Sequence, residues 1–130
     1  MREIKFRAWD IMGGQMTYFK SLRDFCEFKA KFVNATHNLQ YTGIKDKNGK
    51  EIYEGDIIGY GDEDVRSVVR FGEYCFNDDE YGVKGVGFYL EHFEYGKAVD
   101  MQSGGYSSPA STNMVIGNLY ENPGLLTPKL

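Results

Sequence analysis

The sequence lacks any long apolar run and contains only two cysteines, and these absences exclude several classes of protein. No run approaches the ~18 apolar residues that cross a bilayer, so we expect neither a membrane span nor a membrane partner. Cys26 and Cys75 form neither a CxxC pair nor a disulfide framework. The charged start of the chain, Arg2 to Arg7, is not followed by the apolar segment of a signal peptide. We therefore expect reduced thiols and a cytoplasmic protein.

Ligands for metals and catalytic groups are also scarce. His37 and His92 are the only histidines, and neither has the set of four neighbouring ligands that zinc requires. The acidic runs 62–64 and 78–80 offer oxygen ligands for Mg²⁺ or Ca²⁺, although neither has the alternating pattern of an EF-hand. A cation site and a solvated acidic loop both stay open for these runs. We assign no catalytic residue, no metal and no cofactor, and expect a protein that is not an enzyme.

The composition is that of a soluble globule with an uneven distribution of charge. Of the 130 residues, 42% are hydrophobic and 15% are aromatic, which is enough for one buried core. The net charge is −4, but residues 1–50 carry ten basic and five acidic side chains, whereas residues 51–130 carry five and fourteen. Ends of opposite sign favour association between copies, so we expect a homo-oligomer. The alternative is a surface on which both signs are scattered after folding.

The first part of the chain predicts a β-hairpin followed by one helix. Residues 3–9 alternate between apolar and polar, Gly13-Gly14 signals a turn, and residues 16–19 read as a second strand. Ser21 is then a helix N-cap, and apolar residues recur at three- and four-residue steps. We expect a helix over residues 22–32 whose phenylalanine face packs on the hairpin, with Cys26 on that same core face. Residues 1–38 form this predicted hairpin–helix element.

From residue 39 onward the pattern predicts only strands. Asn48-Gly49 is a strong hairpin signal because both positions tolerate a positive φ. Short strands are expected at 39–44, 51–53, 56–60, 65–71, 86–93 and 114–120, with loops at 61–64, 77–80 and 96–111. Glycines inside the strands permit the bends of a small closed sheet. The predicted fold is mainly β with one helix (α+β), in which the hairpin–helix element packs on a small antiparallel barrel formed by residues 39–130.

One candidate surface emerges from the strand alternation. Lys5, Arg7 and Trp9 fall on the same face of the first strand, where basic and aromatic side chains can track a nucleic-acid backbone and stack a base. The other reading is a polar outer face with Trp9 covering the helix. A pI near 5.2 and the acidic second half of the chain oppose phosphate binding. The candidate nucleic-acid or partner surface comprises Lys5, Arg7, Trp9, Lys45, Lys47 and Lys50.

Three stretches of the sequence resemble a known family. They are residues 2–10 (REIKFRAWD), 40–58 (QYTGIKDKNGKEIYEGDII) and 115–123 (VIGNLYENP). In their amino acids and in their order along the chain, these stretches resemble the YopX family of phage and prophage proteins. The resemblance implies a bacteriophage-encoded protein in the cytoplasm of a bacterial host, with an N-terminal α/β element and a C-terminal SH3-like barrel. It implies no activity and transfers no catalytic residue.

These observations lead to two functional hypotheses of different kinds. The first is a phage accessory protein without enzymatic activity, acting as a protein-interaction or self-assembling module on a host or phage protein. The alternative is a nucleic-acid-binding module that uses the basic and aromatic hairpin face. The feature that separates them is whether the hairpin face and the Asn48-Gly49 turn form one positive surface.

Overall fold

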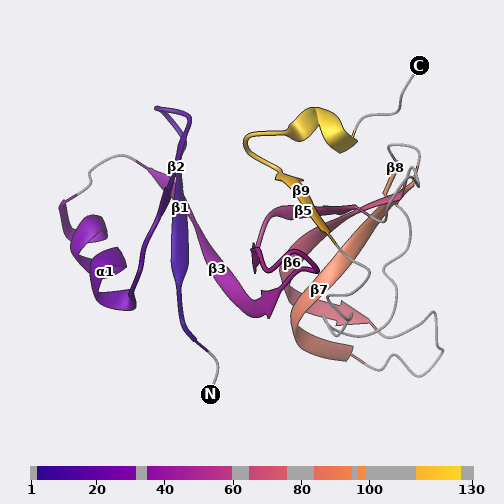
Figure 1. Cartoon of the computed structure of the whole chain (residues 1–130), viewed down its shortest axis with the longest axis horizontal. Helices are drawn as coiled ribbons and strands as arrows, with labels where there is room; N and C mark the ends of the chain where they lie inside the picture. The colour runs from indigo at the N-terminus through magenta and orange to yellow at the C-terminus, as the bar shows by residue number, and fades with distance from the viewer. Residues whose placement is uncertain are drawn as a thin grey trace.

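The computed structural model of the chain describes residues 3–31, 35–59, 65–75, 84–94, 97–98 and 114–126. Its order of elements is β1 (Phe6–Asp10), β2 (Gln15–Tyr18), α1 (Leu22–Lys31), β3 (Thr36–Lys45), β4 (Glu51–Tyr53), β5 (Asp56–Gly59), β6 (Val65–Cys75), β7 (Lys84–Glu94), β8 (Lys97–Ala98), β9 (Met114–Asn118) and the short 3₁₀ helix η1 (Pro123–Leu126). The strands form two antiparallel sheets, β2-β1-β3-β4 and β8-β7-β6-β5-β9 (Figure 1). The coarse prediction of a mainly β protein with one helix is confirmed.

The predicted hairpin and helix are both present, and aromatic rings join them. The ring of Phe6 stacks on Phe25 of α1 with centroids 4.7 Å apart, and Phe19 contacts both Phe25 and Phe28. The N–H of Asp24 donates to Oγ of Ser21 at 3.1 Å, which is the expected N-cap bond. The helix therefore packs on one face of the first sheet (Figure 1).

The placement of Cys26 on the core face of the helix was wrong, because its side chain is exposed. The phenylalanine stripe of α1 and the side chain of Lys29, which donates to Oγ1 of Thr36, contact the sheet, and no residue of the helix is fully buried. Leu22, one turn before Cys26, lies beside that stripe and is also exposed. A single helix against two short strands buries a narrow stripe, so apolar residues at its margin stay in solvent.

Strand β3 is longer than the sequence predicts and joins the two predicted units. Its first half pairs with β1, with Phe6 opposite Gln40 and Asp10 opposite Thr36, while its second half pairs with β4. The predicted boundary between residues 38 and 39 therefore falls inside one continuous strand. The Asn48-Gly49 turn closes the β3–β4 hairpin as expected, with Gly49 at φ +83°.

The second sheet curves into a half-barrel and shares the apolar core with β4 of the first sheet. Ile52 of β4 packs with Ile58, Val69 and Phe88 of the second sheet in the fully or nearly buried centre. Strands β6 and β7 pair over their whole length, from Val65 opposite Glu94 to Cys75 opposite Lys84, so they extend beyond the predicted strands 65–71 and 86–93. Closure into an SH3-like barrel stays a prediction. The expected loops 61–64 and 77–80 lie outside the described residues, as does 96–111 apart from β8.

None of the helices in the described parts of the chain has the length and apolar character needed to span a bilayer.

Hydrogen bonds to the Asp46 carboxylate connect the β3–β4 turn to β9. Oδ1 of Asp46 accepts the N–H groups of Asn48 (2.8 Å) and Lys50 (2.9 Å), and its Oδ2 accepts the N–H of Val115 in β9 (3.0 Å). Burial by itself would raise the pKa of Asp46, but these backbone donors outweigh it and hold the pKa below the ordinary value. The carboxylate thus stabilises the folded state in its ionised form.

We expect Asp46→Ala to lower the free energy of unfolding by about 2–4 kcal/mol at pH 7, because three backbone donors lose their acceptor. The folded-state pKa lies below the unfolded value, so this contribution is fully present above the unfolded pKa and is lost as the pH falls through the folded pKa. Denaturant unfolding at pH 7 and at pH 3 measures the deficit, which is expected to be smaller at pH 3.

Glu27→Gln is the control, because Glu27 is exposed and, within the described ranges, forms its ion pair with Arg23 one helical turn away. Its effect is expected to stay below about 0.5 kcal/mol. An Asp46→Ala deficit of the same size at both pH values would contradict the ionised carboxylate as the acceptor.

Candidate binding cleft

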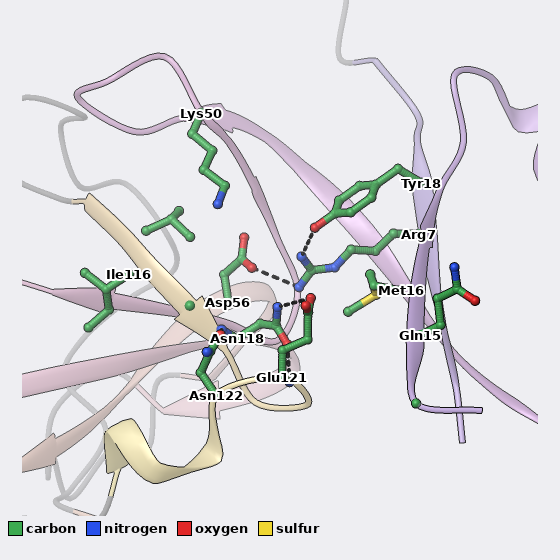
Figure 2. A pocket seen from close by; sticks show the side chains of 13 residues that line it. Arg7, Gln15, Met16, Tyr18, Lys50, Asp56, Ile116, Asn118, Glu121 and Asn122 are labelled. Carbon is green, nitrogen blue, oxygen red and sulfur yellow. Dashed lines mark hydrogen bonds and ion pairs between the residues drawn. The ribbon is translucent and has the colours of Figure 1, made fainter. Parts of the chain in front are cut away.

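Arg7 is buried between the two sheets and holds them together. Its side chain is 2% exposed, as is that of Asp56 at the start of β5. Nη2 of Arg7 lies 2.9 Å from Oδ1 of Asp56 and donates to the carbonyl oxygen of Glu54 at 3.1 Å, while Nη1 donates to the Tyr18 hydroxyl at 3.3 Å (Figure 2). A strand of the first sheet is thereby linked to a strand of the second through one guanidinium.

Two aromatic rings enclose this guanidinium. The Arg7 guanidinium carbon lies 5.0 Å from the centroid of the Tyr53 ring and 5.8 Å from that of Tyr18, within the range of a cation–π contact. The two rings themselves meet edge to face. Burial, followed by the nearby carboxylate of Glu51, raises the pKa of Tyr53 to about 12, so its hydroxyl stays neutral beside the cation.

This burial disfavours the ionised form of Asp56. Removal from water raises the pKa of Asp56, and the Arg7 guanidinium and the N–H of Tyr53, which donates to Oδ2 at 2.7 Å, oppose that rise. The net direction is upward, as for a buried pair whose desolvation exceeds its mutual attraction. The ion pair therefore fixes how the two sheets meet more than it adds to stability.

Trp9 belongs to the same interface. Its ring stacks on Tyr120 with centroids 5.7 Å apart, and Tyr120 also stacks on His37 at 5.2 Å. The predicted alternation of the first strand is thus correct, but the face that carries Arg7 and Trp9 points into the molecule. Arg7 is not part of an exposed surface, and Trp9 does not cover the helix.

The remaining predicted basic residues divide into paired and exposed side chains. Nζ of Lys5 lies 2.6 Å from Glu51 and 3.4 Å from Glu3, and the hydrogen bond to Glu51 is the main cause that raises its pKa. Lys45, Lys47 and Lys50 are exposed around the β3–β4 turn. The positive charge of Lys5 and Arg7 is therefore compensated locally, and the hairpin face and the turn do not form one uninterrupted positive surface.

A tight turn after β9 completes the interface. Oδ1 of Asn118 accepts the N–H groups of Tyr120 (3.0 Å) and Glu121 (2.9 Å) and so directs Tyr120 toward Trp9. Gly55 has a φ of +89°, and a Cβ there would lie 3.1 Å from the Tyr120 ring, so glycine is the residue that this position accepts without strain. Sequence reasoning missed Tyr53, Asp56, Asn118 and Tyr120; the signal was the set of polar and aromatic residues inside the stretches 40–58 and 115–123.

A cleft of about 540 Å³ opens beside the ion pair. Met16 and Tyr18 of β2 form one wall, and Asn118 and Glu121 lie on the opposite side, while Lys50 reaches in from the β3–β4 turn (Figure 2). Of the six predicted site residues, the structure brings Arg7 and Lys50 to this cleft. Its lining is mainly polar, which suits a ligand that offers hydrogen-bonding groups.

In the described ranges, no three His, Cys, Asp or Glu side chains gather where they would hold a metal ion. The acidic runs 62–64 and 78–80 lie outside those ranges.

Comparison with known proteins identifies the family. The family model described as YopX protein matches residues 5–127, which is nearly the whole chain. The chain belongs to the YopX family. This YopX-family chain is also similar to the crystal structure of protein EF1440 from Enterococcus faecalis, with 24% identity, a TM-score of 0.56, and coverage of 97% of this chain and 99% of that one. That likeness concerns the fold alone, and no curated protein matches significantly.

In this YopX-family protein, the three stretches that carry the resemblance meet at one place. Residues 2–10 contribute Arg7 and Trp9, residues 40–58 contribute Asp56, and residues 115–123 contribute Asn118 and Tyr120. Segments far apart in the sequence therefore build a single interface with the cleft beside it.

The buried pair predicts non-additive mutations. Arg7→Met and Asp56→Asn are each expected to lower the free energy of unfolding by about 3–5 kcal/mol, because each leaves a buried partner uncompensated. The double variant Arg7→Met/Asp56→Asn is expected to lose at least about 1 kcal/mol less than the two single losses combined. Urea unfolding of the four proteins measures this coupling, and additive losses would contradict a direct ion pair.

Proposed function

We propose that this protein is a non-enzymatic interaction module of a bacteriophage or prophage, acting in the host cytoplasm. It binds an extended segment of a host or phage protein in the cleft, and the segment adds a strand to the free edge of β2. The observation that supports this proposal is that β2, an edge strand, forms one wall of the cleft. Strand addition is a common mode of peptide recognition because main-chain hydrogen bonds supply affinity for many sequences.

The register of the hairpin shows which backbone groups of β2 are open. The N–H of Phe19 donates to the carbonyl of Phe6, and antiparallel pairs alternate between bonded and non-bonded positions. Thr17, opposite Ala8, is thus directed toward β1, whereas the backbone N–H and C=O of Met16 and Tyr18 are directed toward the free edge. These groups are spaced to receive one extended strand.

The edge of β2 also lacks the usual protection against strand pairing. Its sequence, Gln15 to Tyr18, contains no charged residue and no proline, and no other described strand pairs with its outer side. Proteins normally shield such edges with lysines, prolines, bulges or a covering segment. An uncharged open edge beside a cleft supports a binding role for this strand.

A second copy of the chain and a nucleic acid are the competing occupants. A second copy presents the same open edge, and the basic first part and acidic second part of the sequence favour its approach. Nucleic acid is supported only by the exposed Lys45, Lys47 and Lys50, because Lys5 and Arg7 already have carboxylate partners. The net charge of −4 acts against this alternative.

Selection from a random linear-peptide library on the immobilised full chain tests the proposal. We expect peptides with dissociation constants of about 1–100 μM, which corresponds to about 5–8 kcal/mol. Bound peptide should slow amide hydrogen exchange at Met16 and Tyr18, measured by NMR. Thr17 is the internal control, because its amide already faces β1 and should change little.

The other outcomes are distinct. Failure to select any peptide, or protection confined to surfaces away from β2, would overturn the proposal. Protection of Met16 and Tyr18 that rises with protein concentration alone would make a second copy the occupant. Anisotropy titrations with DNA and RNA at low salt test the remaining alternative, which requires binding that is lost when Lys45, Lys47 and Lys50 are replaced by glutamate.

A further inference from the structure

The cleft contains one basic side chain that forms no ion pair with a described residue, although its charge acts at longer range on the carboxylates of Asp46 and Asp56. Lys50 forms no ion pair with any described residue, whereas Arg7 in the floor of the cleft is paired with Asp56. Figure 2 shows the Lys50 side chain extending from the turn into the cleft on the side of Asp56 that faces away from Tyr18. Its ammonium group therefore lies at one end of the cleft, where its N–H groups can donate hydrogen bonds to a ligand.

The backbone holds Lys50 in this position. Its N–H donates to Oδ1 of Asp46, and the same carboxylate accepts the N–H of Val115 in the β9 wall of the cleft. Lys47 comes from the same turn but does not line the cleft. The two lysines thus offer the same charge in two different places, one inside the site and one outside it.

The opposite end of the cleft is acidic. Glu121 lines this end, and one of its carboxylate oxygens accepts a hydrogen bond from Nδ2 of Asn118 at 2.9 Å. An acidic ligand group is repelled at this end and attracted at the Lys50 end. The charges across the cleft therefore distinguish the two directions in which an extended segment can lie.

We infer that the segment bound in the cleft carries an acidic side chain, Asp or Glu, whose carboxylate pairs with the ammonium group of Lys50. This inference rests on the proposed binding of an extended segment and adds its chemistry. Main-chain pairing with β2 supplies sequence-independent affinity, and the contact with Lys50 selects the sequence and the direction of the segment.

The peptides selected on the wild-type chain provide the probes. We expect an acidic residue at a fixed position, and exchange of that residue for its amide should weaken binding about fivefold, the value of a partly exposed ion pair. Lys50→Glu should weaken binding of the acidic peptide about tenfold or more and should strengthen binding of the same peptide with lysine at that position. Fluorescence anisotropy of labelled peptides measures each dissociation constant.

Lys47→Glu is the matched control, since it makes the same charge change on the same turn outside the cleft. It should alter affinity less than about twofold at moderate salt, where exposed charges are screened. Circular dichroism and thermal unfolding should show that both variants fold, as expected for exposed side chains.

Failure of this inference differs from failure of the proposed function. If peptides bind along β2 but acid and amide forms bind equally, or if Lys47→Glu and Lys50→Glu weaken binding equally, strand addition stands and recognition by Lys50 is overturned. If no peptide binds along β2, the proposed function itself fails.

Discussion

The buried ion pair between Arg7 and Asp56 is the contact on which the rest of this structure depends. It joins β1 of the first sheet to β5 of the second, and its geometry is completed by Tyr18, Tyr53 and the carbonyl of Glu54. A buried charge demands partners in fixed directions, whereas apolar contacts tolerate sliding. The pair therefore sets one arrangement of the two sheets, at a cost that is visible in the raised pKa of Asp56.

The same polar junction explains why a cleft lies at this place. In the apolar core, Ile52 of β4 packs with Ile58 and Val69 of the second sheet, and the phenylalanine cluster lies on the helical side of the first sheet. Away from β4, the strands β1 and β2 meet the second sheet through charged, aromatic and amide groups, which leave part of the β2 face uncovered. The open strand edge and the polar cleft have the same cause. The two sheets are linked by the ion pair of Arg7 but do not pack against each other along their whole faces.

Local signals in the sequence were reliable where the interaction that they report is local. The Ser21 cap and the Asn48-Gly49 turn appear as expected because each depends on neighbouring residues. The predicted alternation holds for residues 6–9, whereas β1 begins only at Phe6 and Ile4 is exposed. Cys26 was misplaced because helical periodicity cannot say how wide the covered stripe is. Arg7 was misplaced on an exposed face for a related reason: alternation assigns side chains to two faces but does not say which face another layer will cover.

The sequence by itself determined the class of the fold and the family, and the three family stretches contain Arg7, Asp56 and Tyr120 without singling out the last two. Only the tertiary structure decided what these residues do. Arg7 changed from an expected surface cation to a buried link because its partner lies 49 positions away in the chain, and no local pattern encodes such a pairing. Lys50 and β2 likewise become neighbours across one cleft only after the sheets have met. Local preferences act over a few residues, whereas a binding site is made by whichever distant segments burial brings together.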